Sequence, residues 1–462
     1  MAHDVHQATK RRGNFATSMS RTLLYSIAPV LAAILIATRA MAQTDSTAPL
    51  VLSLAECWSR ADNNNKTISI RRLGVAAAAE NVLDAKASRL PDINADANVE
   101  KTTPLVIYED DDLGDHFDHA YVRTHYKLGA DAYLNLYNGG RTNLKIEEQQ
   151  TLQHIAETKE AYSISNIRLH IAADYLDLQK NLVFRDLLLE DINTQQRQLD
   201  RIRQNLAHGI VLKSDALRAE VKLSQEKLTL TRINNDITLA SQRLAIEIGE
   251  PEDRAIVPTG ISDADSIALR SYNDYADAAG DRSYENQLAK EDVALSGIRL
   301  KSIKASQSVK LGLYGTFAYA YPETFLYPYY HDPYSLGIAG VKASFPISSF
   351  YQNKHKVAAA RLDYEQKQVA AKDVGDKVRV NIRQAWLRYQ ECLEKIAVSQ
   401  KNVEQSIENQ RIVSNTYFNQ TSLITDLLDA NVQLLQSRFD LVQAKTDAQL
   451  QYYQLLYVTD KL

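Results

Sequence analysis

The sequence predicts a mostly α-helical protein with a transmembrane β-barrel portion, built from long helical hairpins in two tandem repeats that each carry two β-strands. Three observations support this fold class: the chain repeats itself at an offset of 211 residues, each copy holds two long runs in which Gly375 is the only Gly or Pro, and four short segments alternate apolar with polar residues. A repeat has to be recognised before a domain count is taken from chain length. We therefore interpret the 462 residues as two copies of one elongated unit and not as two or three compact domains.

The long helices are expected where these runs lie. In chain order they cover about residues 141–208, 210–248, 352–418 and 421–460. Gly209 breaks the first run, and the offset places Gln420 at the matching break of the second copy. At ~1.5 Å per residue, a helix of roughly 67 residues spans about 100 Å, several times the width of an ordinary domain. Parts of this length indicate an elongated molecule.

Four segments are expected to be β-strands. They cover about residues 92–101, 121–136, 309–321 and 334–347. In the first of them, the apolar positions that alternate with polar ones are Ile93, Ala95, Ala97 and Val99. Alternation with a period of two over ~10 residues is typical of a strand with lipid on one face and water on the other. The last segment changes parity around Gly340, which predicts a β-bulge there.

A soluble β-sandwich would show similar alternation, so the strands have to be interpreted together with the rest of the chain. Each pair of strands lies between helices, and the chain has an export signal but no run that suits a spanning helix. Four strands cannot close a membrane barrel, whose smallest common form has about eight, and each unpaired backbone group in lipid costs several kcal/mol. The protein is therefore expected to oligomerise, and two, three or four copies would give about eight, twelve or sixteen strands.

The N-terminus is expected to be an export signal. Basic residues precede an apolar stretch from Leu23 to Ala37, and an A-x-A cleavage site ends at Ala42, which places the mature start at Gln43. The alternative is an uncleaved membrane anchor, but the stretch is shorter than the ~20 residues of a spanning helix and contains Pro29. The first 42 residues hold five basic residues and one acidic residue, so removing their +4 from the net −4 leaves −8. An acidic mature chain argues against nucleic acid as a partner.

The cysteines and the two loops that connect paired strands are expected to be structural. Cys57 and Cys392 could form one disulfide after export, but Cys392 lies in an apolar helical stripe, which favours a buried thiol. The first loop, residues 102–120, is rich in acidic residues and holds two histidines; a metal site is conceivable, but the residues follow no known ligand spacing, which favours a solvated loop. The second loop, residues 319–334, is rich in Tyr and Pro, which is typical of a membrane interface more than of a ligand site.

The helix expected at residues 352–418 carries one apolar stripe. Its members are Val378, Ile382, Trp386, Tyr389, Leu393, Ile396, Val403 and Ile407. Spacings of three, four or seven residues place them on one side of a helix whose other sides are polar, which suits packing around a wet channel. The alternative is a plain coiled coil, in which the strand pairs would have no purpose.

The sequence contains no motif of a catalytic or cofactor site. It has no P-loop, no Gly-rich dinucleotide turn, no HExxH and no Ser elbow, and its 10 histidines are scattered. An enzyme is therefore not expected, and neither is a cofactor or a bound metal.

In its motifs and their order, the mature chain resembles the TolC-like outer-membrane efflux proteins. The segments that carry the resemblance are Leu52–Glu56, Asn63–Asn65, Leu90–Pro91, Leu136–Arg141 and Tyr417–Ala430. The resemblance implies a homotrimer, in which a twelve-stranded barrel in outer-membrane lipid is continued by a barrel of long helices across the periplasm. It divides the chain into a signal peptide (residues 1–42), a first structural repeat (43–250), a linker (251–270) and a second structural repeat (271–462).

Three positions depart from the family pattern. Lys66 follows the Asn run, Gln420 stands where the elbow Gly is expected, and Phe350–Gln352 replace a second Gly-Gly-Arg. The fold is expected to tolerate these changes, but the backbone of the second elbow is less well defined by the sequence.

The resemblance also implies a function, that of a passive exit duct. Such a duct is the outer-membrane channel of a tripartite efflux or type I secretion system, and it opens when its helices rearrange on docking of a periplasmic adaptor (membrane fusion) protein. The adaptor is tied to an inner-membrane pump, which supplies the energy. The expected location is the cell outer membrane, extending into the periplasm. From the residues alone two other classes stay open: a periplasmic adaptor, which also has long hairpins, and a coiled-coil structural protein of the cell envelope.

The second break between long helices supplies the candidate site. Asp426 and Asp429 are three residues apart on one helix face, and a trimer would place six such carboxylates near its axis. Like charges crowded at a narrow opening favour cations over anions. The resemblance implies that Asp426 and Asp429 form the channel constriction and that Asp215, with Tyr417, links the helix ends. The alternative role for such an aspartate is stabilisation of a helix N-terminus, worth roughly 0.3 to 1 kcal/mol.

Overall fold

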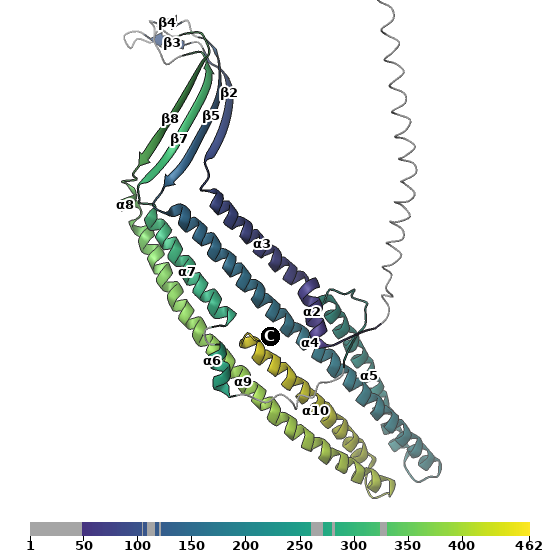
Figure 1. Cartoon of the computed structure of the whole chain (residues 1–462). Helices are drawn as coiled ribbons and strands as arrows, with labels where there is room; N and C mark the ends of the chain where they lie inside the picture. Colours follow the sequence, from purple (N-terminus) through teal and green to yellow (C-terminus); the bar gives the residue numbers. More distant parts are fainter. Residues whose placement is uncertain are drawn as a thin grey trace, which may run out of the picture.

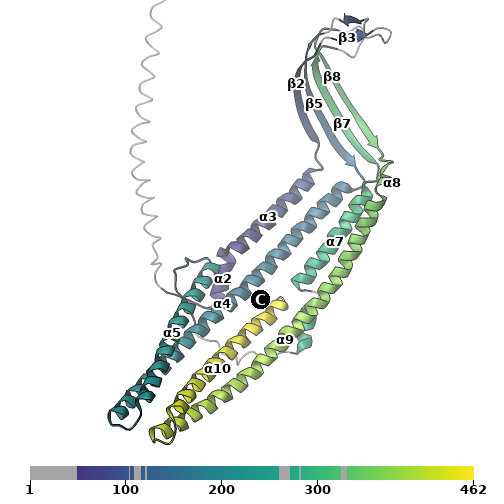
Figure 2. The ribbon, with the colours of Figure 1, turned by 180° about the vertical axis from the view of Figure 1, so that it is seen from behind.

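The molecule is elongated, with a β-sheet at one end and two helical elbows at the other (Figure 1). Two helices, α4 (Arg141–Ala207) and α9 (Lys354–Phe418), run from the base of the sheet to the elbows, as both views show (Figure 1, Figure 2). The computed structural model describes residues 49–103, 105–108, 116–119, 122–259, 271–279, 282–323 and 330–462. The expected signal peptide, part of each strand-connecting loop and most of the expected linker lie outside these residues.

Each long helix is flanked by shorter helices along its length. In the first repeat these are α2 (Leu54–Asn64), α3 (Lys66–Ala87) and α5 (Lys213–Glu247). In the second repeat they are α6 (Tyr272–Ala279), α7 (Tyr284–Ala305), α8 (Ser349–Gln352) and α10 (Ile424–Val458). α3 packs on the half of α4 nearer the sheet and α5 on the half nearer the elbow, and α7 and α10 pack in the same way on α9. The molecule is therefore about four helices wide along its whole helical part.

Two of the expected helices begin later than the uninterrupted runs suggest. α5 starts at Lys213 and α10 at Ile424, three residues after the expected 210 and 421. The residues before them, Leu212 and Leu423, are extended, with ψ angles of 151° and 156°. The chain has to reverse its direction at each elbow, so these residues cannot already be helical.

The shorter helices meet end to end halfway along the molecule. Asn65 lies between α5 and α3: its Nδ2 donates to the carbonyl of Glu247 (2.8 Å), and its Oδ1 accepts the N–H of Thr67 (2.8 Å). In the second repeat, the carboxylate of Asp460 accepts the N–H of Tyr284, the first residue of α7 (3.2 Å). At each junction one polar side chain satisfies helix-terminal groups that would otherwise lack a partner.

The sheet is antiparallel and has the strand order β2-β5-β7-β8. Its members are β2 (Asp92–Lys101), β5 (Thr124–Tyr137), β7 (Lys310–Tyr321) and β8 (Tyr334–Ser344). Two small pairs accompany it: β1 (Leu50–Leu52) runs parallel to β6 (Ile256–Pro258), and β3 (Leu105–Tyr108) pairs with β4 (His116–His119). β2 and β8 have one neighbour each, so within the described residues both edges of the sheet are open.

The strand register brings the expected apolar positions onto one face. Val99 of β2 pairs with Tyr126 of β5, which in turn pairs with Tyr321 of β7. In the same way Ile93 pairs with Ala132. Because side chains alternate between the two faces of a sheet, the polar positions of these strands share the other face. The sheet is thus apolar on one side and polar on the other in its first three strands.

The bulge expected at Gly340 is not present. Residues 334–344 pair with residues 310–320 without a register shift. Gly340 lies opposite Tyr314, and a Cβ at this glycine would come within 3.0 Å of the tyrosine ring. The glycine therefore leaves space for the aromatic ring on the neighbouring strand. The apolar positions of β8 change from one alternate set to the other because Leu336 and Ile338 lie on the same face of the sheet as that ring.

Three apolar clusters hold the helices together. One lies between α4, α5 and the layer formed by α2, β1 and β6, a second surrounds the elbows, and a third joins α6, α9 and α10. Cys57 is buried in the first cluster and Cys392 packs against the third, and both thiols are free. Among the described helices none is both long and apolar enough to cross a membrane. The described residues also hold no group of three or more His, Cys, Asp or Glu suited to a metal ion.

The apolar stripe of α9 follows the expected pattern over most of its length. Val378, Ile382, Tyr389 and Ile396 are buried in the third cluster. The pattern fails at its end, where Ile407 is 44% exposed. The neighbouring Ser406 is buried instead, and its hydroxyl is hydrogen-bonded to that of Ser437 on α10 (2.8 Å). A polar contact thus replaces the apolar one near the elbow.

A buried pair of carboxyl groups lies between α4 and α5. Gln195 donates to Asp191 (2.8 Å) and also to Glu226, whose second carboxyl oxygen is buried without a hydrogen-bond partner. The nearest cationic group is Lys222, at 4.0 Å, and Arg438 of α10 faces Asp191. Burial, followed by the charge of Asp191, raises the pKa of Glu226. One proton is therefore held between the two groups at a pH where exposed carboxyl groups have lost theirs.

We expect this pair to make the protein less stable as the pH rises. The folded state holds a proton that the unfolded state has already lost above the usual glutamate pKa, so the free energy of unfolding falls as the pH rises towards the raised pKa of the folded state. The loss is on the order of 2 kcal/mol. Thermal unfolding of the purified protein between about pH 5 and pH 8 measures it. Glu226→Gln should reduce this slope, whereas Glu220→Gln, at a half-exposed position of α5 that pairs with Arg203 of α4, should leave it in place. Equal slopes in all three proteins would contradict the prediction.

Candidate functional site at the helical elbows

The two elbows have the same backbone structure. At the first, the N–H of Ile210 donates to the carbonyl five residues earlier (2.9 Å), and at the second the N–H of Thr421 does the same (2.9 Å). The residues before them, Gly209 and Gln420, have φ angles of 72° and 63°. This is a Schellman-type helix end, in which the residue after the C-cap adopts a left-handed conformation. The offset of 211 residues thus relates the elbows in structure as well as in sequence.

The second elbow holds this conformation although it lacks glycine. A left-handed residue other than Gly costs roughly 1 to 2 kcal/mol. We expect Gln420→Gly to slow amide hydrogen exchange at residues 419–423 by roughly fivefold, which corresponds to about 1 kcal/mol of local stability. The matched reverse change, Gly209→Gln, should speed exchange at the first elbow; a Cβ at Gly209 would meet no heavy atom within 4 Å, so only the backbone preference is tested. Faster exchange in Gln420→Gly would contradict this account.

Asp426 and Asp429 lie in the first turns of α10, directly after the second elbow, and both are exposed. The carboxylate of Asp426 accepts the N–H of Leu423 (3.1 Å), so this residue also stabilises the start of the helix. Asp429 lies one turn further along on the same face. In the single chain the two carboxylates therefore point away from the core and are free to meet those of other copies.

Asp215 and Tyr417 come from different hairpins and lie close to one another. Tyr417 is buried near the end of α9, and its hydroxyl has no hydrogen-bond partner. Burial, together with the charge of Asp215 near the start of α5, raises the pKa of Tyr417. The two residues are thus brought together across the hairpins, but no hydrogen bond joins them.

Other contacts join the two hairpins near the elbows, and no motif in the sequence predicts them. The guanidinium of Arg201 on α4 stacks on the ring of Phe418 (3.8 Å). Asn431 of α10 donates to Gln198 of α4 (2.8 Å). Further from the elbows, Arg438 of α10 lies 3.5 Å from Glu190 of α4. The only sequence signal for them is a set of polar residues at core-facing positions, of which Asn431 is 4% exposed.

Two apolar stripes remain uncovered on the outermost helices. The edge stripe of α5 consists of Leu217, Val221, Leu228, Leu239 and Ile246. The edge stripe of α9 consists of Leu362, Val369, Val380, Leu387 and Val398. At 3.6 residues per turn, the members of each stripe fall within about 40° of one another. Exposed apolar side chains lined up on one face of a helix indicate an interaction site.

Within the described residues, both the sheet and the helical layer of this chain end in uncovered edges. Residues 58–250 match the family described as Outer membrane efflux protein. The outer membrane efflux protein BepC of Brucella suis biovar 1 (strain 1330) is 22% identical over 424 residues, which cover 90% of this chain and 87% of that protein.

Solved structures show the same fold. The outer-membrane channel OprN aligns with a TM-score of 0.73 at 14% identity, over 88% of this chain and 90% of OprN. CusC aligns with a TM-score of 0.73 at 14% identity, over 88% and 92% of the two chains. The outer membrane protein VceC of Vibrio cholerae aligns with a TM-score of 0.71 at 15% identity, over 88% and 95%.

The resemblance to the TolC-like outer-membrane efflux proteins is confirmed by these comparisons, as is the fold class of long helical hairpins with paired strands. The matched family consists of outer-membrane efflux proteins and not of enzymes, and the predicted location in the outer membrane agrees with it. The roles of Asp426, Asp429, Asp215 and Tyr417 stay predictions.

Proposed function

We propose that three copies of this chain close into a duct, which crosses the outer membrane as a twelve-stranded β-barrel and the periplasm as an α-helical barrel. One observation carries the proposal: the sheet and the helical layer are open on the same two sides. β2 lies on the side of α3 and α5, and β8 lies on the side of α9 (Figure 1). A ring of copies would pair each β8 with a neighbouring β2 and bring the edge stripe of α9 against that of α5. The number of copies follows the family resemblance.

Closure of the ring accounts for two features of the single chain, its open strand edges and the apolar face of its sheet. An open strand edge in lipid leaves backbone groups unpaired at several kcal/mol each, and a closed barrel has no edge. The apolar face of the sheet, with Val99, Tyr126 and Tyr321 in register, then meets lipid, and the polar face lines water. The helical part continues the wet interior away from the membrane.

The elbows form the periplasmic end of this duct and its gate. Three copies bring six carboxylates, from Asp426 and Asp429, to the narrow end, where they favour the passage of cations. Asp215 and Tyr417 belong to the contacts that hold the two hairpins of one copy together in the closed state. Separation of the hairpins opens the duct without chemical work in this chain.

Opening is driven by partners. A periplasmic adaptor protein docks on the helical barrel and links it to an inner-membrane pump, which supplies the energy for efflux or type I secretion. Two features support the assignment of the energy source to a partner. The sequence has no nucleotide-binding motif. The hairpins meet through a few polar contacts, such as that of Asn431 with Gln198, which a docking protein can rearrange.

Cell fractionation tests the proposed function. We expect the mature protein in the outer-membrane fraction, as an oligomer of three chains whose mobility in a denaturing gel changes on heating. A protein found in the soluble fraction, or tethered to the inner membrane, would contradict the proposal and favour an adaptor or a structural coiled coil.

A further inference from the structure

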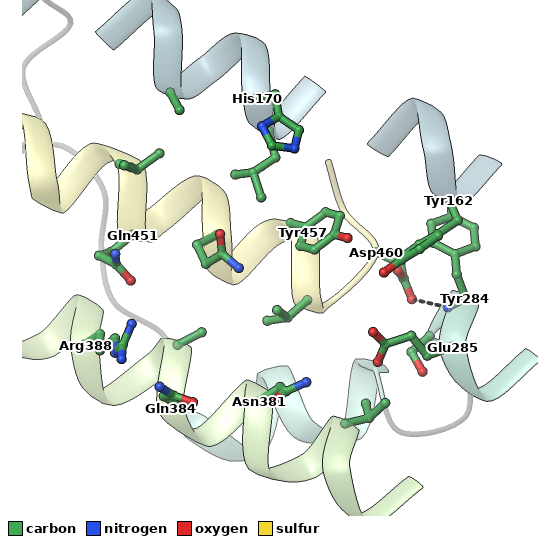
Figure 3. Close-up of a pocket in the computed structure, with 18 residues that line it drawn as sticks. Tyr162, His170, Tyr284, Glu285, Asn381, Gln384, Arg388, Gln451, Tyr457 and Asp460 are labelled. Carbon is green, nitrogen blue, oxygen red and sulfur yellow. Dashed lines mark hydrogen bonds between the residues drawn. The ribbon is translucent and has the colours of Figure 1, made fainter. Parts of the chain in front are cut away.

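A cavity of about 580 Å³ lies where the end of α10 meets the start of α7 (Figure 3). Its walls come from α4, α7, α9 and α10, so that both repeats contribute. A volume of this size falls in the usual range of small-molecule sites, roughly 300 to 1,000 Å³. It lies at mid-height of the helical part, far along the chain from Asp426 and Asp429.

The cavity opens on the side of α4 and α9 that faces away from a peripheral layer, by which we mean α2, β1 and β6 on α4 and α6 on α9. On α9, Trp386 contacts Tyr272 of the peripheral helix α6 (ring centroids 6.1 Å apart), whereas Gln384, two residues earlier, lines the cavity. On α4, the hydroxyl of Tyr175 donates to the carbonyl of Leu52 in β1 (3.1 Å), whereas Ala173 lines the cavity. Two residues correspond to about 200° around a helix. In the proposed duct we place the peripheral layer on the outer surface, so that the cavity faces the interior.

One end of the cavity combines aromatic rings with carboxylates (Figure 3). The ring centroid of Tyr162 lies 6.0 Å from that of Tyr284 and 6.1 Å from that of Tyr457. The carboxyl groups of Glu285 and Asp460 lie beside these rings. In the part of the chain that the structure describes, neither carboxyl group forms an ion pair. Negative charge next to aromatic faces attracts an organic cation.

Asp460 is held in place for this role. It has a φ of 51° at the end of α10, and its carboxylate accepts the N–H of Tyr284. Burial raises the pKa of Asp460 to about 6, so the group is mainly ionised at neutral pH and becomes neutral in acid. Arg388 lies at the opposite end of the cavity (Figure 3), which disfavours a second positive charge there.

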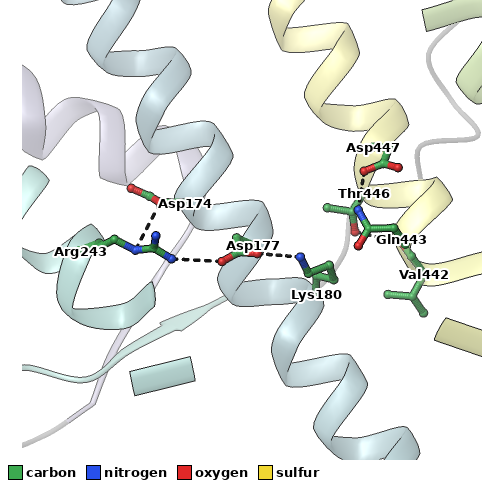
Figure 4. Close-up of polar contacts among 8 residues, drawn as sticks. All are labelled: Asp174, Asp177, Lys180, Arg243, Val442, Gln443, Thr446 and Asp447. Carbon is green, nitrogen blue, oxygen red and sulfur yellow. Dashed lines mark hydrogen bonds and ion pairs between the residues drawn. The ribbon is translucent and has the colours of Figure 1, made fainter. Parts of the chain in front are cut away.

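At the matching place of the first repeat, ion pairs join the two helices. There Arg243 of α5 lies 3.8 Å from Asp174 and 3.3 Å from Asp177, both on α4 (Figure 4). At the offset of 211 residues these three positions are Gln454, Ala385 and Arg388, and all three line the cavity. Where ion pairs join α5 to α4 in the first repeat, the matching residues of the second repeat line the cavity instead.

We propose that this cavity binds monovalent organic cations that carry an aromatic ring, with the positive charge between Glu285 and Asp460 and the ring against the three tyrosines. The proposal rests on the proposed function and names a class of cargo for it. Three copies would place three such sites around the duct, above the acidic gate, where they would hold cationic cargo on its way out.

Ethidium, an aromatic monovalent cation whose fluorescence rises on binding, is a suitable probe for the purified full-length mature oligomer in detergent. We expect the double variant Asp460→Asn, Glu285→Gln to bind it at least tenfold more weakly than wild type. Asparagine tolerates the left-handed conformation at position 460, so the fold should be kept. Gln384→Trp, which fills the cavity without changing its charge, should also weaken binding, whereas Glu408→Gln, an exposed change near the elbow, should not.

Two outcomes would overturn the proposal: equal affinity for ethidium in wild type and in the double variant, or equal affinity for the anionic dye fluorescein and for ethidium. Current recordings separate this failure from that of the proposed function. If the oligomer conducts but ethidium neither binds nor blocks, the duct stands and the cavity is not a site. If no form conducts, the duct fails, and the binding comparison in detergent still decides the role of the cavity.

Discussion

Replacing Asp426 and Asp429 together by alanine should raise the ionic current through the closed duct by roughly twofold or more. Alanine removes the bulk of six side chains at the narrow end of a trimer. It also removes the hydrogen bond from the Leu423 N–H, which fixes the first turn of α10 beside the elbow. Single-channel recording in a planar bilayer measures the effect.

The asparagine pair, Asp426→Asn with Asp429→Asn, separates charge from shape. Asparagine keeps most of the volume and can still cap a helix, so the closed current should stay small. The preference for cations over anions should fall, because the carboxylate charges are gone. A closed current that is unchanged in the alanine pair would remove these two residues from the gate.

Placing lysine on the edge stripe of α5 should abolish the trimer. Val221 and Leu228 are more than half exposed in the single chain, and the proposed ring buries them against a neighbouring α9. Two lysines in this contact would be desolvated without partners, at a cost of several kcal/mol for each interface. We expect Val221→Lys with Leu228→Lys to give single chains in detergent, as measured by light scattering after size-exclusion chromatography.

A matched control is available on the same helix. Asn234 is exposed and lies six residues from Leu228, about 120° around α5, so Asn234→Lys adds a charge outside the stripe. This variant should still form trimers. If the double lysine variant also formed trimers, the stripe would not be an interface between copies.

Much of the fold could be predicted because it repeats and because its helices are long. The near absence of Gly and Pro from the runs that became α4 and α9, where Gly375 is the only exception, can be seen without any knowledge of packing. α3 and α7 were missed for a physical reason: α3 packs on one side only, and Ile70 and Leu73 are exposed on it, so its sequence carries no clear apolar stripe. The wrong bulge at Gly340 has a similar origin, because the ring of Tyr314, which the glycine accommodates, comes from a neighbouring strand.

The candidate site was less accessible to sequence reasoning. The offset alone placed Gln420 at the position of Gly209, and both residues have the left-handed backbone that a Schellman end needs. Contacts between hairpins depend on how α4 and α10 pack, which no local pattern encodes. Arg201 on Phe418 and Asn431 with Gln198 are therefore visible only in the structure.

The central claim, that this chain forms a duct, is tested most directly by single-channel recording of the purified mature protein in a planar bilayer. We expect small, cation-selective currents from a folded trimer. Folded trimers that carry no current in either the wild type or the alanine pair of Asp426 and Asp429 would contradict it.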